Sequence, residues 1–360
     1  MLCGGKPFGP QRDSLEHGAH IVVGTPGRIQ DHLQRQTLDL TSVATFVLDE
    51  ADRMLDMGFA EVMAAITAAL PKKRQTLLLS ATFPDDIKKM SRAIQRQPIE
   101  VKVDTVLTHD ETVVEQLFFE IQKHERNTAL LALFEHYQPG NAMVFCNTKK
   151  QCAEVAAFLQ EHDIEAAAIH GDLDQRDRDQ VLLQFTNNTS PVLVASDVAA
   201  RGLDIPALAM VVNFELPRDG DTYVHRIGRT GRAGETGQAF SLVTPSEAPR
   251  LRVIEDHLQI NCLCDVLESL NRNPNYQLQG DMTTLQFDAG RKQKLRPGDI
   301  LGALTGDAGL AGDQIGKIKI LDNSSYVAIA RPVLRQAMNY LAQGKIKGRS
   351  IRVRRLKLHR

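Results

Sequence analysis

Several features that mark special classes of protein are missing from this sequence of 360 residues. Its apolar runs are too short to span a bilayer, and the N-terminal stretch MLCGGKPFGP lacks the apolar segment of a secretory signal. Its five cysteines form no C-x-x-C pair and no histidine cluster completes a zinc set, so we interpret them as reduced thiols. Internal repeats and low-complexity tracts are also lacking. These absences favour a cytoplasmic protein that has no contact with a membrane.

The composition is that of an ordinary globular protein. Hydrophobic residues make up 42% and charged residues 24% of the chain, whose length suits two or three domains. The formal net charge of −1 does not by itself point to a partner. The positive charge is unevenly distributed, however, because it concentrates near the C-terminus.

Short apolar runs alternate with amphipathic stretches of helical period between about residues 20 and 260. Near-continuous apolar runs are typical of parallel strands that are covered on both faces. The alternation therefore predicts an α/β fold with a mostly parallel sheet. We expect strands within these runs: HIVVGTP (20–26), ATFVLDEAD (44–52), QTLLLSATF (75–83), NAMVFCNT (141–148), IEAAAIHG (164–171), PVLVASD (191–197), MVVNFELP (210–217) and GQAFSLVT (237–244).

A pause in this alternation at about 104–127 indicates a domain boundary near residue 105. Only three convincing core strands precede it, whereas complete doubly wound domains commonly use about five or six. We therefore expect two parallel-sheet domains, an incomplete one over 1–105 and a fuller one over 106–260.

The stretch after residue 260 follows a different pattern. Residues 261–282, which include the polar NRNPNYQLQGDM, are interpreted as a linker. Residues 283–360 then show strand and helix patterns in the order β-α-β-β-α-β, with a final strand predicted over 350–358. This order predicts a small α+β domain of the split βαβ arrangement.

Two carboxylates follow one predicted strand directly. Asp49 and Glu50 come after the apolar run FVL, and ligand sites in open α/β sheets lie beyond the carboxyl ends of the strands. There, one carboxylate could hold a hydrated Mg²⁺ and the other could orient a water molecule. Taken alone, however, the pair favours an acidic surface turn. Ser80 and Thr82 end the next predicted strand, where their hydroxyl groups could bind a neighbouring carboxylate.

Arginines and glycines gather in turns after other predicted strands. In HRIGRTGRAG (225–234), Arg229 and Arg232 lie three residues apart, so a helical turn would point both guanidinium groups the same way. Guanidinium groups suit phosphate oxygens, although a solvated basic loop would have the same composition. Glycine or arginine also follows predicted strands in DVAARGLDIP (197–206), HGDLDQRDRD (170–179) and TPGR (25–28). A glycine at such a strand end lets backbone amides approach a phosphate closely.

Together these segments resemble the helicase core of the DEAD-box RNA helicases. The segments TPGR, VLDEAD, SAT, FCNT, HGD, ARGLD and HRIGRTGR occur in the order and with the spacing of that family. The stretches GGKPFGPQRDSL, RPGDILGALTG and IGKI, with the Lys-Ile-Lys-Gly near the end, resemble its DbpA subgroup. The resemblance implies two RecA-like domains with ATP bound between them, followed by an RRM-like RNA-binding domain over 283–360.

The resemblance also implies a catalytic set that acts on ATP with Mg²⁺. Asp49 and Glu50 would hold the ion, and Glu50 would activate the hydrolytic water. Asp52, together with Ser80 and Thr82, would couple hydrolysis to strand separation. The remaining residues implied at the nucleotide, as arginine fingers or as contacts, are Arg229, Arg232, Gly202, Asp204 and His225.

RNA would lie along both RecA-like domains through mainly backbone contacts, which suit binding without sequence preference. The residues that the resemblance implies at the RNA phosphates are Thr25, Gly27, Arg28, Thr148, Gly171 and Arg178.

The C-terminal stretch GKIKGRSIRVRRLKLHR (344–360) is strongly basic and contains no acid. A solvated charged tail would have the same composition, whereas an RRM-like domain would use these residues to bind RNA. The stretch NSSYVAIA (323–330) does not match the aromatic RNP1 pattern of RRM domains and offers only Tyr326 for stacking, so we expect binding by basic loops and strand ends. The DbpA resemblance implies a hairpin of 23S ribosomal RNA as target and precursors of the large ribosomal subunit as partners. The basic residues are Lys345, Lys347, Arg349, Arg352, Arg354, Arg355, Lys357 and Arg360.

The chain departs from the family in one respect. The family places an adenine-reading Gln motif and a G-x-x-x-x-G-K-T phosphate loop ahead of a glycine doublet, here Gly4-Gly5, and no such loop occurs in these 360 residues. We therefore expect poor ATP hydrolysis by this chain alone. Two alternatives remain open: a non-catalytic remnant that binds ribosomal RNA, and a DNA translocase with the same core. The completed Asp-Glu-Ala-Asp motif and the C-terminal domain favour RNA. The sequence indicates no oligomeric state.

Overall fold

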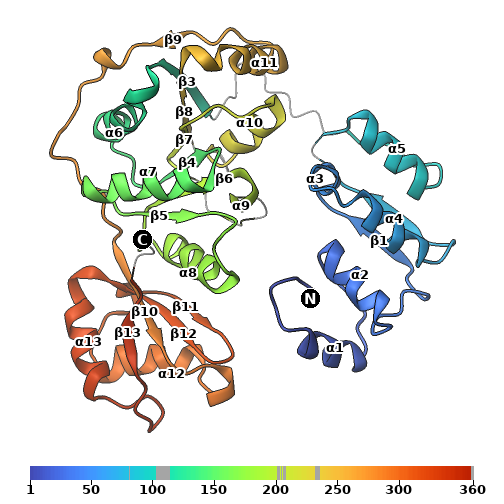
Figure 1. The fold of residues 1–360 in the computed structure, drawn as a ribbon. Coiled ribbons are helices and arrows are strands. Elements are labelled where there is room, and N and C mark those ends of the chain that lie inside the picture. The colour runs from blue at the N-terminus through green and yellow to red at the C-terminus, as the bar shows by residue number, and fades with distance from the viewer. Residues whose placement is uncertain are drawn as a thin grey trace. The chain divides into compact units, whose positions relative to one another are not determined.

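The computed structural model describes residues 1–80, 82–102, 114–200, 203, 205, 208–231 and 236–357. The chain divides into two compact units, Met1–Val106 and Leu107–Arg360. Figure 1 shows the helices and strands of each unit. In the described part of the chain, no helix is both long and apolar enough to cross a membrane.

The first unit is built on a parallel pair of strands, β1 (Thr45–Leu48) and β2 (Gln75–Leu78), in which Leu48 lies opposite Leu78. A small apolar core forms where the strands meet the helices, and it includes Met63 and Ile66. The helices of this unit are α1 (Phe8–Glu16), α2 (Pro26–Gln34), α3 (Ala51–Asp56), α4 (Ala60–Ala68) and α5 (Asp85–Ile94).

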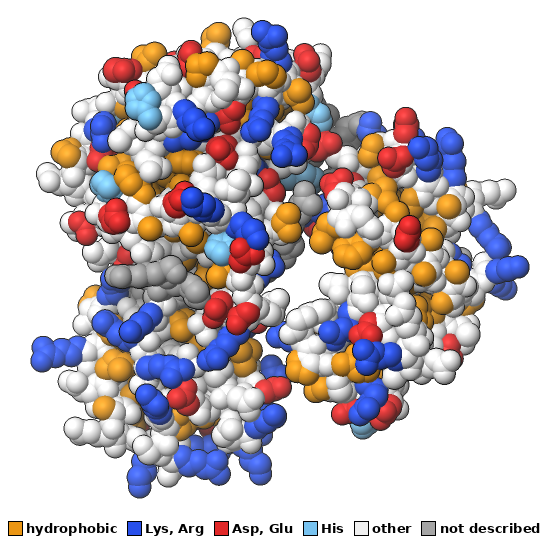
Figure 2. All heavy atoms as spheres, in the orientation of Figure 1, with side chains coloured by type: hydrophobic (Ala, Val, Ile, Leu, Met, Phe, Trp, Pro, Cys, Tyr) orange, Lys and Arg blue, Asp and Glu red, His pale blue; other side chains and the backbone are white. Residues whose placement is uncertain are grey.

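One face of this strand pair is uncovered. Val47, Leu77 and Leu79 are 49%, 42% and 52% exposed, whereas Leu48 is buried. Successive residues of a strand point to opposite faces, so the exposed side chains share the face away from the core. Figure 2 shows hydrophobic side chains at the surface of this unit. Within its described residues, the first unit is thus the incomplete parallel-sheet domain that the sequence predicts.

The prediction of a strand within HIVVGTP (20–26) is wrong. Its residues form an isolated parallel bridge between Leu2 and Gly24, and Ile21 and Val23 are 82% and 60% exposed. The bridge rests on two backbone hydrogen bonds, from Leu2 to Val23 at 2.7 Å and from Thr25 to Leu2 at 2.9 Å. A strand needs a continuous ladder along a neighbour, so apolar character alone did not suffice here.

The second unit begins with the parallel-sheet domain, whose strands pair in parallel in the order β5-β6-β4-β7-β8-β3-β9. Its strands are β3 (Val114–Glu120), β4 (Ala142–Cys146), β5 (Ala166–Ile169), β6 (Val192–Ser196), β7 (Met210–Asn213), β8 (Gly237–Val243) and β9 (Cys264–Asp265). Because β9 pairs with β3, the sheet extends beyond residue 260.

Helices cover both faces of this sheet. Val144 of β4 packs in the layer with α6 and α7, whereas the next residue, Phe145, packs in the layer with α8 and α9. This alternation confirms the predicted doubly wound α/β fold. The helices are α6 (Arg126–Tyr137), α7 (Lys149–Glu161), α8 (Gln175–Thr186), α9 (Asp197–Ala200), α10 (Gly220–Ile227) and α11 (Ala248–Leu258).

The C-terminal domain is a four-stranded antiparallel sheet in the order β11-β12-β10-β13, with helices on one face. Its elements follow the predicted order: β10 (Met282–Phe287), α12 (Pro297–Gly302), β11 (Ile315–Ile320), β12 (Ser325–Ala330), α13 (Leu334–Gln343) and β13 (Val353–Arg355). The last strand is shorter than the predicted 350–358, because its ladder to β10 covers only Leu285–Phe287.

Candidate functional site

The chain turns sharply after β1. Asp49 is exposed, and its Oδ1 accepts the backbone N–H of Glu50 at 3.0 Å. Glu50 has the left-handed backbone angles φ 52° and ψ 49°, which are uncommon for a residue other than glycine. Its carboxylate pairs with Arg53 at 3.0 Å. The turn therefore leaves the Asp49 carboxylate at the surface, at the carboxyl end of the strand.

Asp52 is buried and joins the start of α3 to the end of β2. Its Oδ2 accepts hydrogen bonds from the backbone N–H and the hydroxyl of Thr82, both at 3.0 Å. Its own N–H donates to the hydroxyl oxygen of Ser80 at 3.2 Å. Burial disfavours the charged carboxylate, but the bonds from Thr82, Arg53 and Ser80 outweigh it and hold the pKa of Asp52 below its ordinary value. The structure therefore brings Asp52, Ser80 and Thr82 together.

The exposed carboxylate of Asp49 fits a hydrated magnesium ion. Mg²⁺ binds hard oxygen ligands and is usually held by about one or two carboxylates together with water and phosphate oxygens. Asp49 offers such a group, and the neighbouring Glu50 carboxylate is engaged with Arg53. In this arrangement Asp49 would be the primary ligand of such an ion, with the Glu50 carboxylate next to it.

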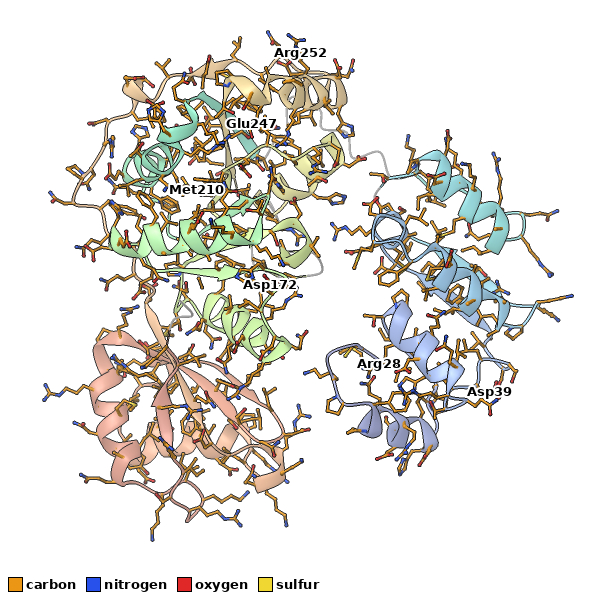
Figure 3. All side chains as sticks on the ribbon, viewed as in Figure 1. Arg28, Asp39, Asp172, Met210, Glu247 and Arg252 are labelled. Atoms are coloured by element: carbon orange, nitrogen blue, oxygen red, sulfur yellow. The ribbon has the colours of Figure 1, made fainter. Side chains whose placement is uncertain are left out.

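Thr25, Gly27 and Arg28 lie at the N-terminus of α2. A Cβ at Gly27 would meet nothing within 4 Å, so the backbone of this first turn is open to a ligand. Helix N-termini with accessible N–H groups bind phosphate well. The Arg28 guanidinium, in contrast, is 14% exposed and donates to the Lys6 carbonyl at 3.0 Å, with Asp31 at 3.7 Å (Figure 3). Within this unit Arg28 thus supports the turn.

In the parallel-sheet domain, several strands end at the same edge, so the segments that follow them are neighbours. Thr148 follows β4 and caps α7 by accepting the N–H of Gln151 at 3.3 Å. Gly171 follows β5, and a Cβ there would meet nothing within 4 Å. Arg178 of α8 donates to the Ala199 carbonyl at 3.2 Å. This edge combines a helix N-terminus, an open glycine and a half-buried arginine.

An ion pair joins two of these segments. Lys149 Nζ contacts the carboxylate of Asp172, which lies in the loop after β5 (Figure 3). Both side chains are 60% exposed, so the pair contributes little to stability. An incoming phosphate could replace the Asp172 carboxylate at Lys149, which the sequence analysis does not include among the RNA-binding residues.

The structure reveals a further residue that sequence reasoning missed. Arg226 of α10 is 1% exposed, and each of its guanidinium N–H groups has an acceptor. Two of them donate to the Asp197 carboxylate oxygens at 2.6 and 2.8 Å. The others donate to Asn147 Oδ1 at 2.9 Å, Asn213 Oδ1 at 3.1 Å and the Glu215 carbonyl at 2.8 Å. Arg226 thereby ties α10 to the ends of β4, β6 and β7.

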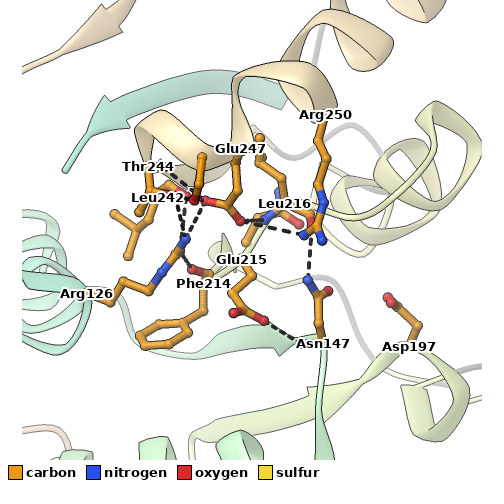
Figure 4. A network of polar contacts seen from close by, with 12 residues as sticks. Arg126, Asn147, Asp197, Phe214, Glu215, Leu216, Leu242, Thr244, Glu247 and Arg250 are labelled. Carbon is orange, nitrogen blue, oxygen red and sulfur yellow. Dashed lines mark hydrogen bonds and ion pairs between the residues drawn. The ribbon is translucent and has the colours of Figure 1, made fainter. Parts of the chain in front are cut away.

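A second buried arginine belongs to the same network (Figure 4). Arg126 donates to the Phe214 carbonyl and pairs with Glu247, whose other oxygen accepts the Leu216 N–H at 3.1 Å. The Leu216 carbonyl in turn accepts from Asn147 Nδ2 at 3.1 Å. The segment that follows β7 is therefore held from both sides, by Arg126 and by Arg226.

This network positions the end of α10 and the residues after it. The helix carries His225 and ends at Ile227. Arg229 thus lies beyond the helix, where its Nη1 donates to the Leu203 carbonyl at 3.1 Å. Three residues predicted at the nucleotide lie outside the described residues: Gly202, Asp204 and Arg232.

Two loops of the C-terminal domain bring basic side chains together. Lys347 Nζ donates to the Lys294 carbonyl at 3.2 Å and lies 3.4 Å from Asp299. The backbone N–H of Arg296, and then Lys347, hold the pKa of Asp299 below its ordinary value. Figure 2 shows Lys and Arg side chains gathered along the lower end of this domain. We call the exposed basic residues of these loops the basic corner: Arg291, Lys292, Lys294, Arg296, Lys345, Lys347 and Arg349.

The sequence analysis predicted only the second of these loops. The other basic residues of the stretch 344–360 lie on or beside the edge strand β13, where Arg354 is 3.6 Å from Asp288. The residues of this group that the structure describes are exposed: Arg352, Arg354, Arg355 and Lys357. Arg360 lies outside the described residues.

Known protein families match three segments of the chain. Residues 1–90 match the DEAD/DEAH box helicase family, residues 125–234 the helicase conserved C-terminal domain, and residues 284–355 the DbpA RNA binding domain. ATP-dependent RNA helicase DbpA of Escherichia coli (strain K12) is 49% identical over 356 residues, which cover 99% of this chain and 77% of that protein. The DbpA of Bacillus subtilis (strain 168) is 35% identical over 98% of this chain and 78% of its own length.

A solved structure agrees with these matches. Saccharomyces cerevisiae Dbp5, bound to RNA and ADP BeF3, superposes with a TM-score of 0.63 and 32% identity, over 69% of this chain and 66% of its own. The likeness covers the parallel-sheet architecture, and the third family match adds the C-terminal domain. The chain therefore belongs to the DEAD-box ATP-dependent RNA helicases of the DbpA type.

Proposed function

We propose that the function is ATP-dependent remodelling of ribosomal RNA, with a hairpin of 23S ribosomal RNA as target and assembly of the large ribosomal subunit as role. The observation that carries the RNA part is the basic corner, where two loops expose seven Lys and Arg side chains in a domain of the DbpA RNA-binding type. The paired loops, linked by Lys347 and Lys294, suit the phosphates of a folded RNA.

The nucleotide chemistry in this proposal falls to the turn after β1. ATP hydrolysis depends on positioning and on stabilising charge more than on covalent chemistry. Asp49 would hold Mg²⁺, which neutralises charge on the phosphates, and Glu50 would orient the attacking water. The Glu50 side chain is 51% exposed, so water would replace part of its interaction with Arg53 when Glu50 turns to the attacking water.

Arg229 and Arg232 would stabilise the charge that develops on the γ-phosphate. Arg226 supports this role as a positioning residue, because it fixes the helix that leads to Arg229. Asp204, Gly202 and His225 would complete the contacts to the nucleotide.

The Asp52 cluster would couple the nucleotide to RNA. Asp52 sits two residues after Glu50 and binds Thr82, which follows β2, so a movement of one strand end is transmitted to the other. Thr25, Gly27, Thr148 and Gly171 would present backbone groups to an RNA strand.

We further propose that this chain by itself hydrolyses ATP slowly, because its 360 residues contain no G-x-x-x-x-G-K-[ST] loop. The second candidate function is a ribosomal-RNA-binding helicase remnant without catalysis. The two candidates share the RNA target and differ only in ATP turnover.

The experiment compares RNA binding by the intact chain and by a variant with Lys294→Gln and Lys347→Gln. The matched control is Lys88→Gln with Lys89→Gln, two exposed lysines of the first unit. Fluorescence anisotropy with a 23S ribosomal RNA hairpin is measured over a series of salt concentrations. Each lost phosphate contact should reduce the slope of log affinity against log salt by roughly 0.7–0.9.

The control variant should bind like the unchanged chain. If both variants lost the same RNA affinity, the loss would reflect the total charge of the chain, and the basic corner would not be the RNA-binding surface. An unrelated RNA hairpin of equal length, and its DNA counterpart, test the target. If all three bind equally well, the ribosomal RNA assignment and the preference for RNA over DNA are wrong.

A further inference from the structure

A polar cleft lies beside the junction of the parallel-sheet domain and the C-terminal domain. Its volume of about 960 Å³ falls within the range of roughly 300–1,000 Å³ that small-molecule sites occupy. One wall comes from the turn between α7 and β5, and the other from the end of β13 and the residues after it (Figure 1). Its described lining residues include no predicted nucleotide contact and no member of the basic corner.

The first wall carries a carboxylate that is open to a ligand. Asp163 is exposed and has the left-handed backbone angle φ 58°, and its carbonyl accepts the Leu278 N–H at 3.1 Å. Its carboxylate has no hydrogen bond or ion pair with the residues that the structure describes. The nearby Glu165 carboxylate, in contrast, accepts the Gly280 N–H at 2.9 Å and pairs with Arg331. Asp163 is therefore the acidic group of this cleft that a ligand can use.

The opposite wall carries two cations. Arg355 ends β13 and Lys357 follows it, and both side chains are exposed and unpaired within the described part of the chain. Their backbone is fixed from behind. Gln184 of α8, 1% exposed, donates to the carbonyls of Leu356 at 3.3 Å and Lys357 at 2.8 Å. The Leu356 N–H donates to the Thr284 carbonyl at 2.9 Å. The cationic wall is thus held in place before any ligand arrives, which reduces the cost of binding.

The charges of the two walls restrict the ligand. Asp163 lines the same cleft as Arg355 and Lys357, yet it pairs with neither of them. A phosphate ion would bind the cations and leave the carboxylate without a donor, whereas a metal cation would face two positive charges. A nucleotide satisfies both walls, because its phosphates suit the cations and its base can donate hydrogen bonds to the carboxylate.

The carboxylate also selects among the bases. An ionised carboxylate only accepts hydrogen bonds, and its two oxygens accept best from two adjacent donors. Guanine offers such a pair on its Watson–Crick edge, the N1–H and the 2-amino group. On the corresponding edges of adenine, cytosine and uracil, each donor lies beside an acceptor, which the carboxylate would repel. In RNA, these edges are accessible on unpaired bases.

We propose that this cleft binds one unpaired guanosine of the RNA, with Asp163 accepting from the base and with Arg355 and Lys357 contacting its phosphates. The inference rests on the proposed RNA binding and deepens it, because it makes Asp163 a specificity-determining residue. A free guanine nucleotide has the same chemistry. RNA is favoured because the exposed Arg352 and Arg354 continue the basic surface along β13 beyond the cleft, where the next phosphates of a strand can bind.

The first measurement compares the affinities of the full chain for the labelled pentamers UUGUU, UUAUU, UUCUU and UUUUU by fluorescence anisotropy. UUGUU should bind about tenfold more tightly than the others, as expected for a bidentate contact to one base. Inosine in place of guanosine, which lacks the 2-amino group, should lose part of this preference. A 4-thiouridine beside the guanosine should crosslink to a peptide that contains Asp163 or Lys357. Equal binding of the four pentamers, or a crosslink only elsewhere, would overturn the proposal.

The second measurement repeats the series with variants. Asp163→Asn should abolish the preference for guanosine, and asparagine tolerates the left-handed backbone at this position. Glu161→Gln, an equal charge change at an exposed residue outside the cleft, is the matched control and should keep the preference. Arg355→Gln should weaken all four pentamers by a similar factor. A preference that survives Asp163→Asn would overturn the role of Asp163.

Two further comparisons separate this proposal from related ones. Guanosine monophosphate should bind far more weakly than UUGUU, and equal affinities would show that RNA is not the source of the ligand. The variant with Lys294→Gln and Lys347→Gln should keep the guanosine preference of the pentamers. If that variant also binds the ribosomal RNA hairpin unchanged, the proposed function loses its RNA surface, while the result for the cleft stands.

Discussion

Replacing Arg226 by methionine tests whether the strand-end network holds the parallel-sheet domain together. Methionine replaces the apolar stem of arginine but ends near the position of Nε, so the change removes the five hydrogen bonds and leaves unfilled only the space of the outer guanidinium atoms. It leaves the Asp197 carboxylate, 26% exposed, without its cation. Two amide oxygens, of Asn147 and Asn213, and the Glu215 carbonyl also lose their donor.

The magnitude follows from the burial of the pair. Removing one partner of a buried ion pair costs about 3–5 kcal/mol, because the other charge remains unpaired. Water can reach part of Asp197, which favours the lower half of that range, whereas the lost neutral hydrogen bonds add about 1 kcal/mol each. We therefore expect Arg226→Met to lower the free energy of unfolding of this domain by about 6–7 kcal/mol, from about 3–4 kcal/mol for the pair and about 1 kcal/mol for each of the three neutral hydrogen bonds.

Hydrogen exchange in urea measures the loss of unfolding free energy in the parallel-sheet domain alone, because the backbone amides of β4 and β6 exchange when that domain unfolds globally. The chain has several domains, so a single optical transition would mix their unfolding. A double-mutant cycle with Asp197→Asn isolates the pair. A loss below about 1 kcal/mol, the scale of a surface ion pair, would refute the reasoning.

Two further predictions concern the first unit. Because the folded pKa of Asp52 lies below 3.8, its stabilisation should be complete above that value and be lost as pH falls through the folded pKa. The difference in unfolding free energy between the unchanged chain and Asp52→Asn should therefore be constant at neutral pH and shrink in acid. If that difference persisted at low pH, the lowered pKa of Asp52 would not be its cause. In a coupled assay, the purified chain should show at most trace RNA-stimulated ATP hydrolysis, and Glu50→Gln should change it little, whereas turnover typical of enzymes, roughly 1–100 s⁻¹ for phosphoryl transfer, would disprove the impairment.

Much of the candidate site was predictable because its signals are local. The apolar runs that end in Asp49 and Ser80 in the first unit, and in Thr148 and Gly171 in the second, place those residues at strand ends, and parallel strands bring such ends to the same edge within each sheet. The contact of Asp52 with Thr82 follows from that rule, since β1 and β2 are neighbours.

Arg226 shows what local reasoning missed. Its place on α10, three residues after the buried Tyr223 and one before Ile227, puts it on the apolar face of the helix. That spacing was a usable signal of burial, but the acceptors come from the ends of three strands that are far apart in sequence. Only their convergence shows that an arginine is satisfied there.

By itself, the sequence determined the family, the α/β class, the order of elements in the C-terminal domain and the strand-end motifs, because each depends on residue type and spacing along the chain. The tertiary structure decided which basic loops form one surface, which strand of the C-terminal sheet is short, that residues 20–26 form no strand, and which residues pair with the buried Thr284. These features depend on contacts between residues such as Lys294 and Lys347 or Asn187 and Thr284, which are distant in sequence. No periodicity within one segment encodes a partner in another, so only the folded chain reveals them.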